Sequence, residues 1–212
     1  MPAGLDPALA AALGVAGLAG WLALDYRAHL QPGETVLVLG AGGSAGQLAK
    51  HSARVLGAGL VVGAARGKAL RQAADLGADA TVDLADEQAI DAGLAAAAPG
   101  GYDVVVDFLW GGVAPHAMNH AKRGARYIQV GSSAGDTSTI TGLALRNKLL
   151  TLVGHSLFAT PAEERRSAYA RLAGHAVDGK FTVHREETRL EDISGTWERL
   201  MTGGSRKLVV SP

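Results

Sequence analysis

The chain has 212 residues and a formal net charge of +0, with 48% hydrophobic and 19% charged residues. This length fits one large domain or one domain with an appendage, and the apolar content suffices for a sizeable core, which excludes global disorder. The balanced charge argues against a nucleic-acid partner, because a polyanion binder needs a basic surplus to release counterions. The chain has no cysteine, which excludes disulfides, thiolate zinc sites and cysteine nucleophiles and fits a reducing cytoplasm, where we expect the protein to work.

The first predicted element is a buried helix within residues 8–24. This stretch is apolar and rich in Ala and Gly, and it has neither the basic region nor the cleavage site of a signal peptide. It falls short of the roughly 20 strongly apolar residues that a membrane span needs. We therefore expect a core helix and no membrane partner.

From residue 33 onward, short apolar runs alternate with helical patterns. Unbroken apolar runs such as TVLVL at 35–39 are typical of strands buried on both faces. The expected strands cover 35–39, 59–63, 80–82, 103–107, 126–130 and 149–154, and the expected helices between them cover 44–56, 68–76, 87–98 and 113–122. Such alternation predicts βαβ units with a parallel sheet.

The last fifty residues have a different pattern, with a helix expected at 161–177, a strand at 181–188, a helix at 190–201 and a strand at 207–210. The prediction for the whole chain is a doubly wound α/β Rossmann fold of about six parallel strands, with an N-terminal helix and a C-terminal α/β extension. We place the lead-in helix in residues 1–30, the dinucleotide-binding domain in 31–160 and the extension in 161–212.

The strongest motif is the glycine-rich turn GAGGSAG at 40–46, which directly follows a predicted strand and opens a predicted helix. Gly40, Gly42 and Ala45 satisfy G-x-G-x-x-A, whereas Gly40, Gly43 and Gly46 satisfy G-x-x-G-x-x-G. Either reading gives a tight turn, a close backbone approach to a pyrophosphate and close helix packing, with the phosphates at the positive end of the helix. A lone string of this kind is weak evidence, but the strand–turn–helix context predicts dinucleotide binding.

The end of the second predicted strand favours NADP(H) over NAD(H). An NAD site places an acidic residue there to hold the ribose 2′-hydroxyl, but the sequence has no Asp or Glu between Gly46 and Asp75. Arg66, and after it Lys68, are the candidates to contact a 2′-phosphate. The alternative is that both are solvated charges at a helix start.

These residues together resemble the medium-chain dehydrogenase/reductase superfamily, in particular its zinc-free quinone-oxidoreductase-like branch. The resemblance rests on the stretch from Ala11 to Leu24, GETVLVLGAGGSAG at 33–46, LGADATVD at 76–83, GARYIQVGSSAG at 124–135, and the tail from Asp178 to LEDISGTWERL and RKLVVSP. It implies hydride transfer between a nicotinamide cofactor and a quinone or enone. It also implies a catalytic domain of over a hundred residues that has no counterpart here, so substrate pocket and catalytic residues stay unassigned.

The resemblance assigns cofactor contacts residue by residue. The pyrophosphate turn corresponds to Gly40, Gly43, Ser44, Ala45 and Gly46, and the adenosine ribose end to Gly63, Ala64 and Arg66. The region near the adenine ribose and linker corresponds to Asp107 and Phe108, and the loop beside the nicotinamide to Gly131, Ser132 and Ser133. The family's cofactor domains often pair through their last strand, which implies a homodimer through residues 151–154.

Three other interpretations of the sequence are open. G-x-S-x-G at 131–135 fits the nucleophile elbow of α/β-hydrolases, with Ser133 as nucleophile and Asp178 and His184 as partners, but the polar residues after it show no helical period. His116 and His120 share a helix face, but a third zinc ligand is not evident, so we expect no metal site. A non-enzymatic NADP(H)-binding module, or a subunit that a partner completes, is the serious alternative to a reductase.

Overall fold

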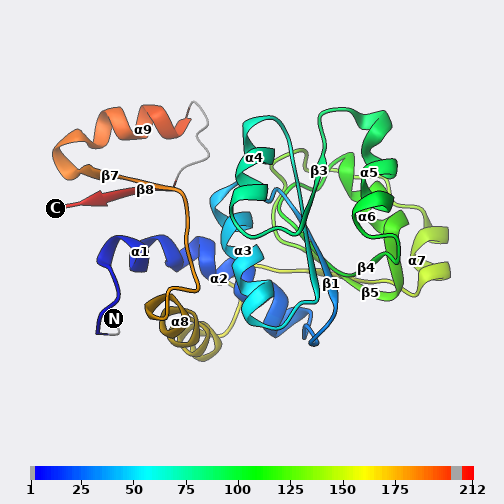
Figure 1. Cartoon of the computed structure of the whole chain (residues 1–212), viewed down its shortest axis with the longest axis horizontal. Coiled ribbons are helices and arrows are strands. Elements are labelled where there is room, and N and C mark those ends of the chain that lie inside the picture. Colours follow the sequence, from blue (N-terminus) through cyan, green and yellow to red (C-terminus); the bar gives the residue numbers. More distant parts are fainter. Residues whose placement is uncertain (1–2, 202–206) are drawn as a thin grey trace.

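The computed structural model describes residues 3–201 and 207–212. Its centre is a parallel sheet of six strands in the order β3-β2-β1-β4-β5-β6 (Figure 1). The strands are β1 (Thr35–Leu39), β2 (Leu60–Ala65), β3 (Ala80–Asp83), β4 (Tyr102–Asp107), β5 (Ala121–Gln129) and β6 (Thr151–Gly154). This strand order is that of the doubly wound Rossmann fold, which confirms the predicted fold class.

Helices cover both faces of the sheet. They are α3 (Ser44–Val55), α4 (Lys68–Asp75), α5 (Ile90–Ala97), which follows a short 3₁₀ turn (Glu87–Ala89), and α6 (Val113–His120). Ala49, Ala53 and Ala73 of α3 and α4 pack with Val36 and Val38 on one face. On the other face, α5 and α6 pack with the side chains that alternate with these, such as Leu37 and Leu39. Both faces of β1 are therefore buried, as its unbroken apolar run predicts.

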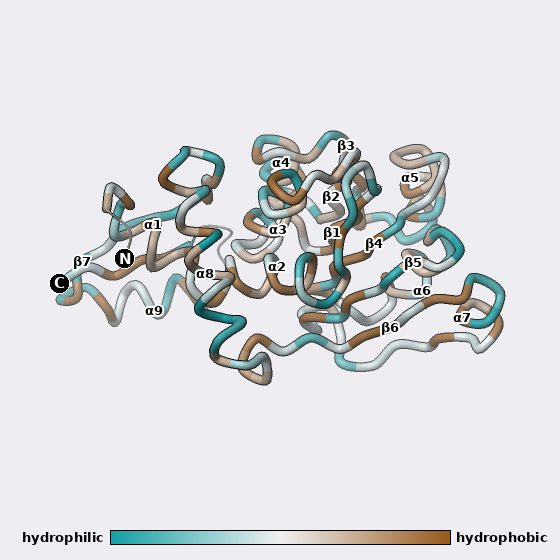
Figure 2. Tube along the Cα trace, turned by 90° about the horizontal axis from the view of Figure 1, so that it is seen from below, coloured by the Kyte–Doolittle hydropathy of each residue, from teal (hydrophilic) through white to brown (hydrophobic). Residues whose placement is uncertain are grey.

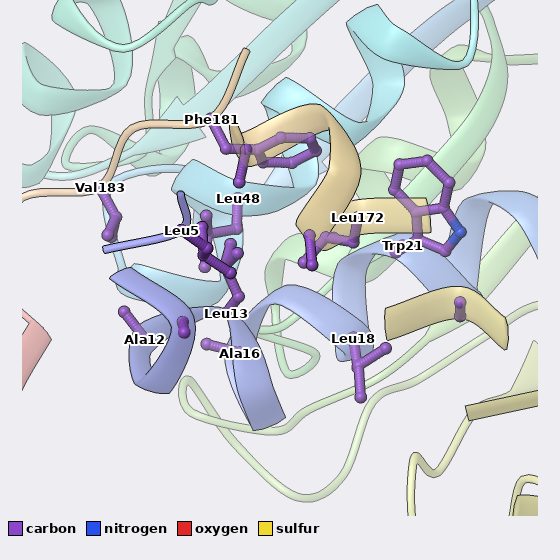
Figure 3. Close-up of a cluster of buried hydrophobic side chains, with 14 of the residues drawn as sticks. Leu5, Ala12, Leu13, Ala16, Leu18, Trp21, Leu48, Leu172, Phe181 and Val183 are labelled. Atoms are coloured by element: carbon purple, nitrogen blue, oxygen red, sulfur yellow. The ribbon is translucent and has the colours of Figure 1, made fainter. Parts of the chain in front are cut away.

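The chain segments before and after this sheet pack against each other. The N-terminal helical run comprises α1 (Pro7–Ala12), a π-helical turn (Leu13–Gly17), α2 (Leu18–Leu22) and a second π-helical turn (Ala23–Arg27). The run lies between α3 and α8 (Ala162–Val177). Figure 3 shows how Leu13, Leu48, Leu172, Phe181 and Trp21 gather there from four parts of the chain. This second core lies outside the sheet but includes α3, the helix that follows the glycine turn.

The N-terminal run is buried, as predicted, although its composition alone is ambiguous. Among the described residues, Pro7–Arg27 is the helix long and apolar enough to cross a membrane, and 61% of its apolar window is buried inside the protein. Trp21 and Leu22 are each 1% exposed. Figure 2 shows the α2 part of this run as an apolar trace. Burial against α3 and α8 accounts for its composition.

The C-terminal extension ends in a small parallel pair of strands. β7 (Arg185–Arg189) pairs with β8 (Lys207–Ser211), and the connection contains a 3₁₀ turn (Leu190–Asp192) and α9 (Ile193–Met201). The predicted strand at 181–188 is partly wrong, because β7 begins only at Arg185, and Phe181 and Val183 pack in the same cluster as Leu48 of α3.

A further helix, α7 (Gly142–Lys148), was not expected from the sequence. Thr141 caps it, since its hydroxyl oxygen accepts a hydrogen bond from the backbone N–H of Ala144 at 3.2 Å. Leu149 then takes a left-handed conformation with φ of 50°. The last strand of the sheet therefore begins at Thr151 rather than at 149.

Candidate functional site

A cavity of about 680 Å³ opens at the carboxyl ends of the sheet strands. It lies where the strand order reverses between β1 and β4, the position at which open α/β sheets bind their ligands. The glycine turn, the end of β2 and the loops after β3, β4 and β5 line it: Gly40, Gly42, Gly43, Ser44, Ala45, Gly46, Ala65, Arg66, Ala69, Leu84, Glu87, Ile90, Phe108, Leu109, Gly112, Val113, Ser133 and Ala134.

The geometry of the glycine turn requires glycine at Gly40 and at Gly46 but leaves room for a side chain at Gly43. Gly40 has φ of +83°, a conformation that side chains rarely adopt. A β-carbon at Gly46 would lie 2.2 Å from the carbonyl oxygen of Gly40, so only glycine lets α3 approach the turn this closely. At Gly43 the nearest atom to such a β-carbon is 3.5 Å away, which leaves its pocket side open.

Gly42 has a packing role that the motif alone does not reveal. A β-carbon there would lie 2.2 Å from the backbone oxygen of Ala69 in α4. The turn is also fixed to β2, because the N–H groups of Gly40 and Ala41 donate to the carbonyl oxygen of Ala64 at 2.9 and 3.1 Å. Ala64 therefore supports the turn through its backbone, and its buried side chain belongs to the sheet core.

The first turn of α3 points its backbone donors at the cavity. Gly43 is the N-cap residue, and no side chain of the described residues caps the helix. Ser44 and Ala45 follow it and line the cavity. The N–H groups at the start of a helix and its positive dipole end favour anions, and the start of α3 lines this cavity.

The end of β2 places only one of the two predicted cations in the cavity. Arg66 lines it, whereas Lys68 lines a separate groove between α4 and residues 183–185, together with Arg71 and His184. The expected second contact of Lys68 with a 2′-phosphate is thus not supported by its position. Gly63 lies inside the fold, where a β-carbon would come within 3.0 Å of the Ala41 side chain.

Asp107 does not present its carboxylate to the cavity. The residue is 0% exposed, and one carboxylate oxygen accepts hydrogen bonds from the N–H groups of Leu109 and Trp110 at 2.7 and 2.9 Å. The other accepts from the hydroxyl of Tyr127 at 2.5 Å. Burial raises the pKa of both Asp107 and Tyr127. Asp107 therefore shapes the turn that places Phe108 at the cavity.

The loop after β5 is held against that turn. A β-carbon at Gly131 would lie 2.9 Å from the carbonyl oxygen of Phe108, and the Ser133 hydroxyl donates to the same oxygen at 3.0 Å. Ser133 lines the cavity, but Gly131 and Ser132 do not. The residues after Ser133 form turns and bends rather than a helix, so the hydrolase elbow lacks its required context.

The structure adds cavity residues that the sequence analysis did not single out. Leu84, Glu87 and Ile90 enter from the β3–α5 connection. Glu87 is the acidic residue among those that line the cavity. It lies after Asp75, beyond the stretch in which the sequence analysis looked for an acid to hold the ribose 2′-hydroxyl. Its place after β3, the neighbour of β2, is the signal that would have identified it.

The two histidines of α6 bind a carboxylate. His116 Nδ1 and His120 Nε2 each lie 3.0 Å from an oxygen of Asp91 in α5. Desolvation by burial is the largest single influence on the pKa of Asp91 and raises it, but the hydrogen bonds and charge attraction of His116 and His120 together outweigh it and lower the pKa. Within the part of the chain that the structure describes, no group of three or more His, Asp or Glu residues is arranged to hold a metal ion.

Comparison with known proteins supports this assignment of the fold. A model of the family described as zinc-binding dehydrogenase matches residues 40–174. The quinone oxidoreductase-like protein 2 homolog of Nematostella vectensis is 31% identical over 155 residues, which cover 73% of this chain and 42% of that protein. A protein of Emericella nidulans named probable NADPH-dependent quinone reductase is 33% identical over 165 residues, which cover 74% of this chain and 45% of that protein.

Among solved structures, the quinone oxidoreductase of Thermus thermophilus, also determined as its NADPH complex, superposes with a TM-score of 0.75 at 28% identity. The match covers 95% of this chain and 64% of that one. The chain spans less than half the length of the two curated relatives.

Proposed function

Since the chain belongs to the zinc-binding dehydrogenase family within the medium-chain dehydrogenase/reductase superfamily, we propose that it is the NADP(H)-binding domain of a quinone- or enone-reducing oxidoreductase. The observation that carries the proposal is the start of α3, which no side chain of the described residues caps. It lies with the open face of Gly43 at a cavity that Arg66 also lines. A dinucleotide carries anionic phosphates that such a helix start binds.

NADP(H) fits the residues of this cavity. The backbone of Gly43, Ser44 and Ala45 would hold the pyrophosphate, and Arg66 would pair with a 2′-phosphate through a charge-assisted hydrogen bond. Phe108 and Ser133 would line the path toward the nicotinamide. These assignments are supported by the position of each residue in the lining.

When bound, NADPH supplies a hydride to an activated C=C bond or quinone. The residues of this chain bind the nucleotide, orient it and bury one side of it. The described residues do not provide the donor set of a zinc site, so we derive no step through zinc. The substrate-binding residues and the proton donor are left unassigned.

The test is a fluorescence titration of the purified chain with NADPH and NADH. Arg66→Ala should raise the Kd for NADPH at least tenfold, since a hydrogen bond to a charged group contributes about 1.5–3 kcal/mol. The Kd of Arg66→Ala for NADH should stay within twofold of the wild-type value. Arg71→Ala is the matched control, because Arg71 lies on α4 but lines the other groove.

Each outcome separates the possible functions. If Arg66→Ala loses affinity for NADPH and NADH equally, the assignment of Arg66 to the 2′-phosphate is contradicted. If the wild-type chain binds neither nucleotide, the dinucleotide site is contradicted. Tight NADPH binding without reduction of any quinone or enone would favour the alternative, a non-enzymatic NADP(H)-binding module or a subunit that needs a partner domain.

Two surfaces support proposals about partners. β6 is the edge strand of the sheet, and its Leu152 side chain is 38% exposed, so we propose a homodimer in which two such edges pair. Leu152→Lys should shift the chain from dimer to monomer in size-exclusion chromatography with light scattering, and a monomeric wild-type chain would contradict this proposal.

The second surface is the apolar face of α9, where Ile193, Trp197, Leu200 and Met201 are 41–71% exposed. Their spacing puts them on one side of the helix, and exposed apolar patches of this kind mark interfaces. We propose that this face contacts a catalytic domain, in the same chain or in a partner.

We also propose that the protein is cytoplasmic, which its lack of cysteine supports.

A further inference from the structure

Residues 181–184, here called the strap, lie along the flank of α3. Phe181 is 1% exposed, and its ring centroid is 5.9 Å from that of His51. The Thr182 hydroxyl is 3.3 Å from Nε2 of His51. Val183 is buried in the same cluster as Leu48 of α3 (Figure 3). The helix that begins at the glycine turn therefore also anchors the segment leading to β7 and β8.

A single buried side chain joins the turn to the strap. Gln47 is 0% exposed. Its Nε2 donates to the carbonyl oxygen of Gly42 at 2.7 Å, and its Oε1 accepts from the N–H of His184 at 2.9 Å. The two contacts fix the orientation of the amide, because one partner is an acceptor and the other a donor.

The contact with Gly42 is one of two hydrogen bonds that fix the orientation of the Gly42–Gly43 peptide in the glycine turn, since the N–H of Gly43 donates to the carbonyl oxygen of Gly40 at 3.1 Å. Gln47 is fully buried and is not part of the cavity lining, so the Gly42 oxygen points into the protein. Because the peptide is planar, rotating it would turn that oxygen toward the cavity. Its lone pairs would then oppose the phosphates that the start of α3 is proposed to bind.

We propose that Gln47 is a positioning residue of the dinucleotide site, which holds the Gly42 carbonyl away from the phosphates and couples the turn to the strap. This inference rests on the proposed binding of NADP(H). Occupation of the turn and docking of the strap then stabilise each other, because both depend on the same amide group.

The experiment measures NADP⁺ affinity from pH 8.5 to 5.5 for wild type, Gln47→Glu and Gln47→Met, with folding checked by circular dichroism. Gln47→Glu keeps the shape and the acceptor for His184 but sets a carboxylate against the Gly42 oxygen. We expect its Kd to exceed that of wild type at least tenfold at pH 8.5. The ratio should fall toward one at low pH, because a protonated carboxyl group again donates to Gly42. Gln31→Glu is the matched control, since Gln31 is exposed and bonded locally to His29.

A second readout covers the case in which Gln47→Glu does not fold. In wild type, NADP⁺ should slow hydrogen exchange at the His184 amide, and in Gln47→Met it should not, with a Kd that is higher at every pH. If wild type binds NADP⁺ and either folded variant binds it with unchanged Kd, the positioning role is refuted while the proposed function stands. If wild type does not bind NADP⁺, the proposed function fails and takes this inference with it.

Discussion

Alanine at two glycines of the same turn should separate binding from stability. At Gly43 the φ angle is −72°, and a β-carbon would meet its nearest atom at 3.5 Å, so Gly43→Ala fits the fold without strain. The loss of a favourable N-cap residue and the gain from a less flexible unfolded chain are each below about 1 kcal/mol and opposite in sign. The free energy of unfolding should therefore change by less than about 1 kcal/mol.

The same substitution should impair binding, because the new methyl group would stand at the open side of the helix start. We expect the Kd for NADPH to rise at least tenfold, which corresponds to about 1.4 kcal/mol. Gly46→Ala should instead lower stability. Its β-carbon would lie 2.2 Å from the Gly40 oxygen and 2.7 Å from the Ala41 α-carbon, both backbone atoms, so α3 must move and stability should fall by about 1–3 kcal/mol.

Urea unfolding and a fluorescence titration on both variants would decide the matter. If Gly43→Ala binds NADPH as tightly as wild type, the phosphates do not approach the backbone at Gly43. If both variants lose the same stability, the two glycines do not have the distinct roles assigned here.

Further predictions concern buried polar groups. Burial lowers the pKa of Lys50 from 10.5 to about 8, so the unfolded chain binds the proton more tightly and wild-type stability should rise between pH 8 and 10.5. At pH 7, urea titrations should give Lys50→Met a free energy of unfolding about 1–2 kcal/mol above that of wild type. This net gain allows for the loss of the hydrogen bond from the Lys50 ammonium group to the Ala73 carbonyl oxygen, and it should vanish by pH 10.5. Burial, with the nearby Lys50, also lowers the pKa of His51 to about 4, so melting temperature should fall as pH drops from 6.5 to 4, and less steeply in His51→Gln. Tyr127→Phe leaves the buried Asp107 without one donor and should lower the unfolding free energy by about 2–3 kcal/mol, whereas an unchanged value would show that the carboxyl group is satisfied without it.

The elements predicted well are those whose evidence is local. TVLVL before the glycine turn needs only its own residues to indicate a strand buried on both faces, and GAGGSAG needs only its immediate context. The helix α7 was missed because a single cap at Thr141 starts it and its seven residues carry no apolar stripe.

Features that depend on distant parts of the chain could not be predicted. The bond from Gln47 to His184 joins residues 137 positions apart. Likewise, Arg66 and Lys68 are two positions apart in the sequence, yet they line different cavities because Gly67, with φ of 55°, turns the chain between them. The sequence therefore identifies charged residues as candidates for binding the 2′-phosphate, but it does not show which of them faces the proposed site.

The packing of the N-terminal run against α8 bears on the order of folding during synthesis. The Tyr169 hydroxyl donates to the Ala10 oxygen across 159 positions, and Arg171 pairs with Asp25 at 2.6 Å. The six strands of the central sheet are complete before α8 leaves the ribosome, while the first helix still lacks its contacts with α8. We expect this helix to be the segment that chaperones and proteases can reach for longest, because closing so long a loop is slow.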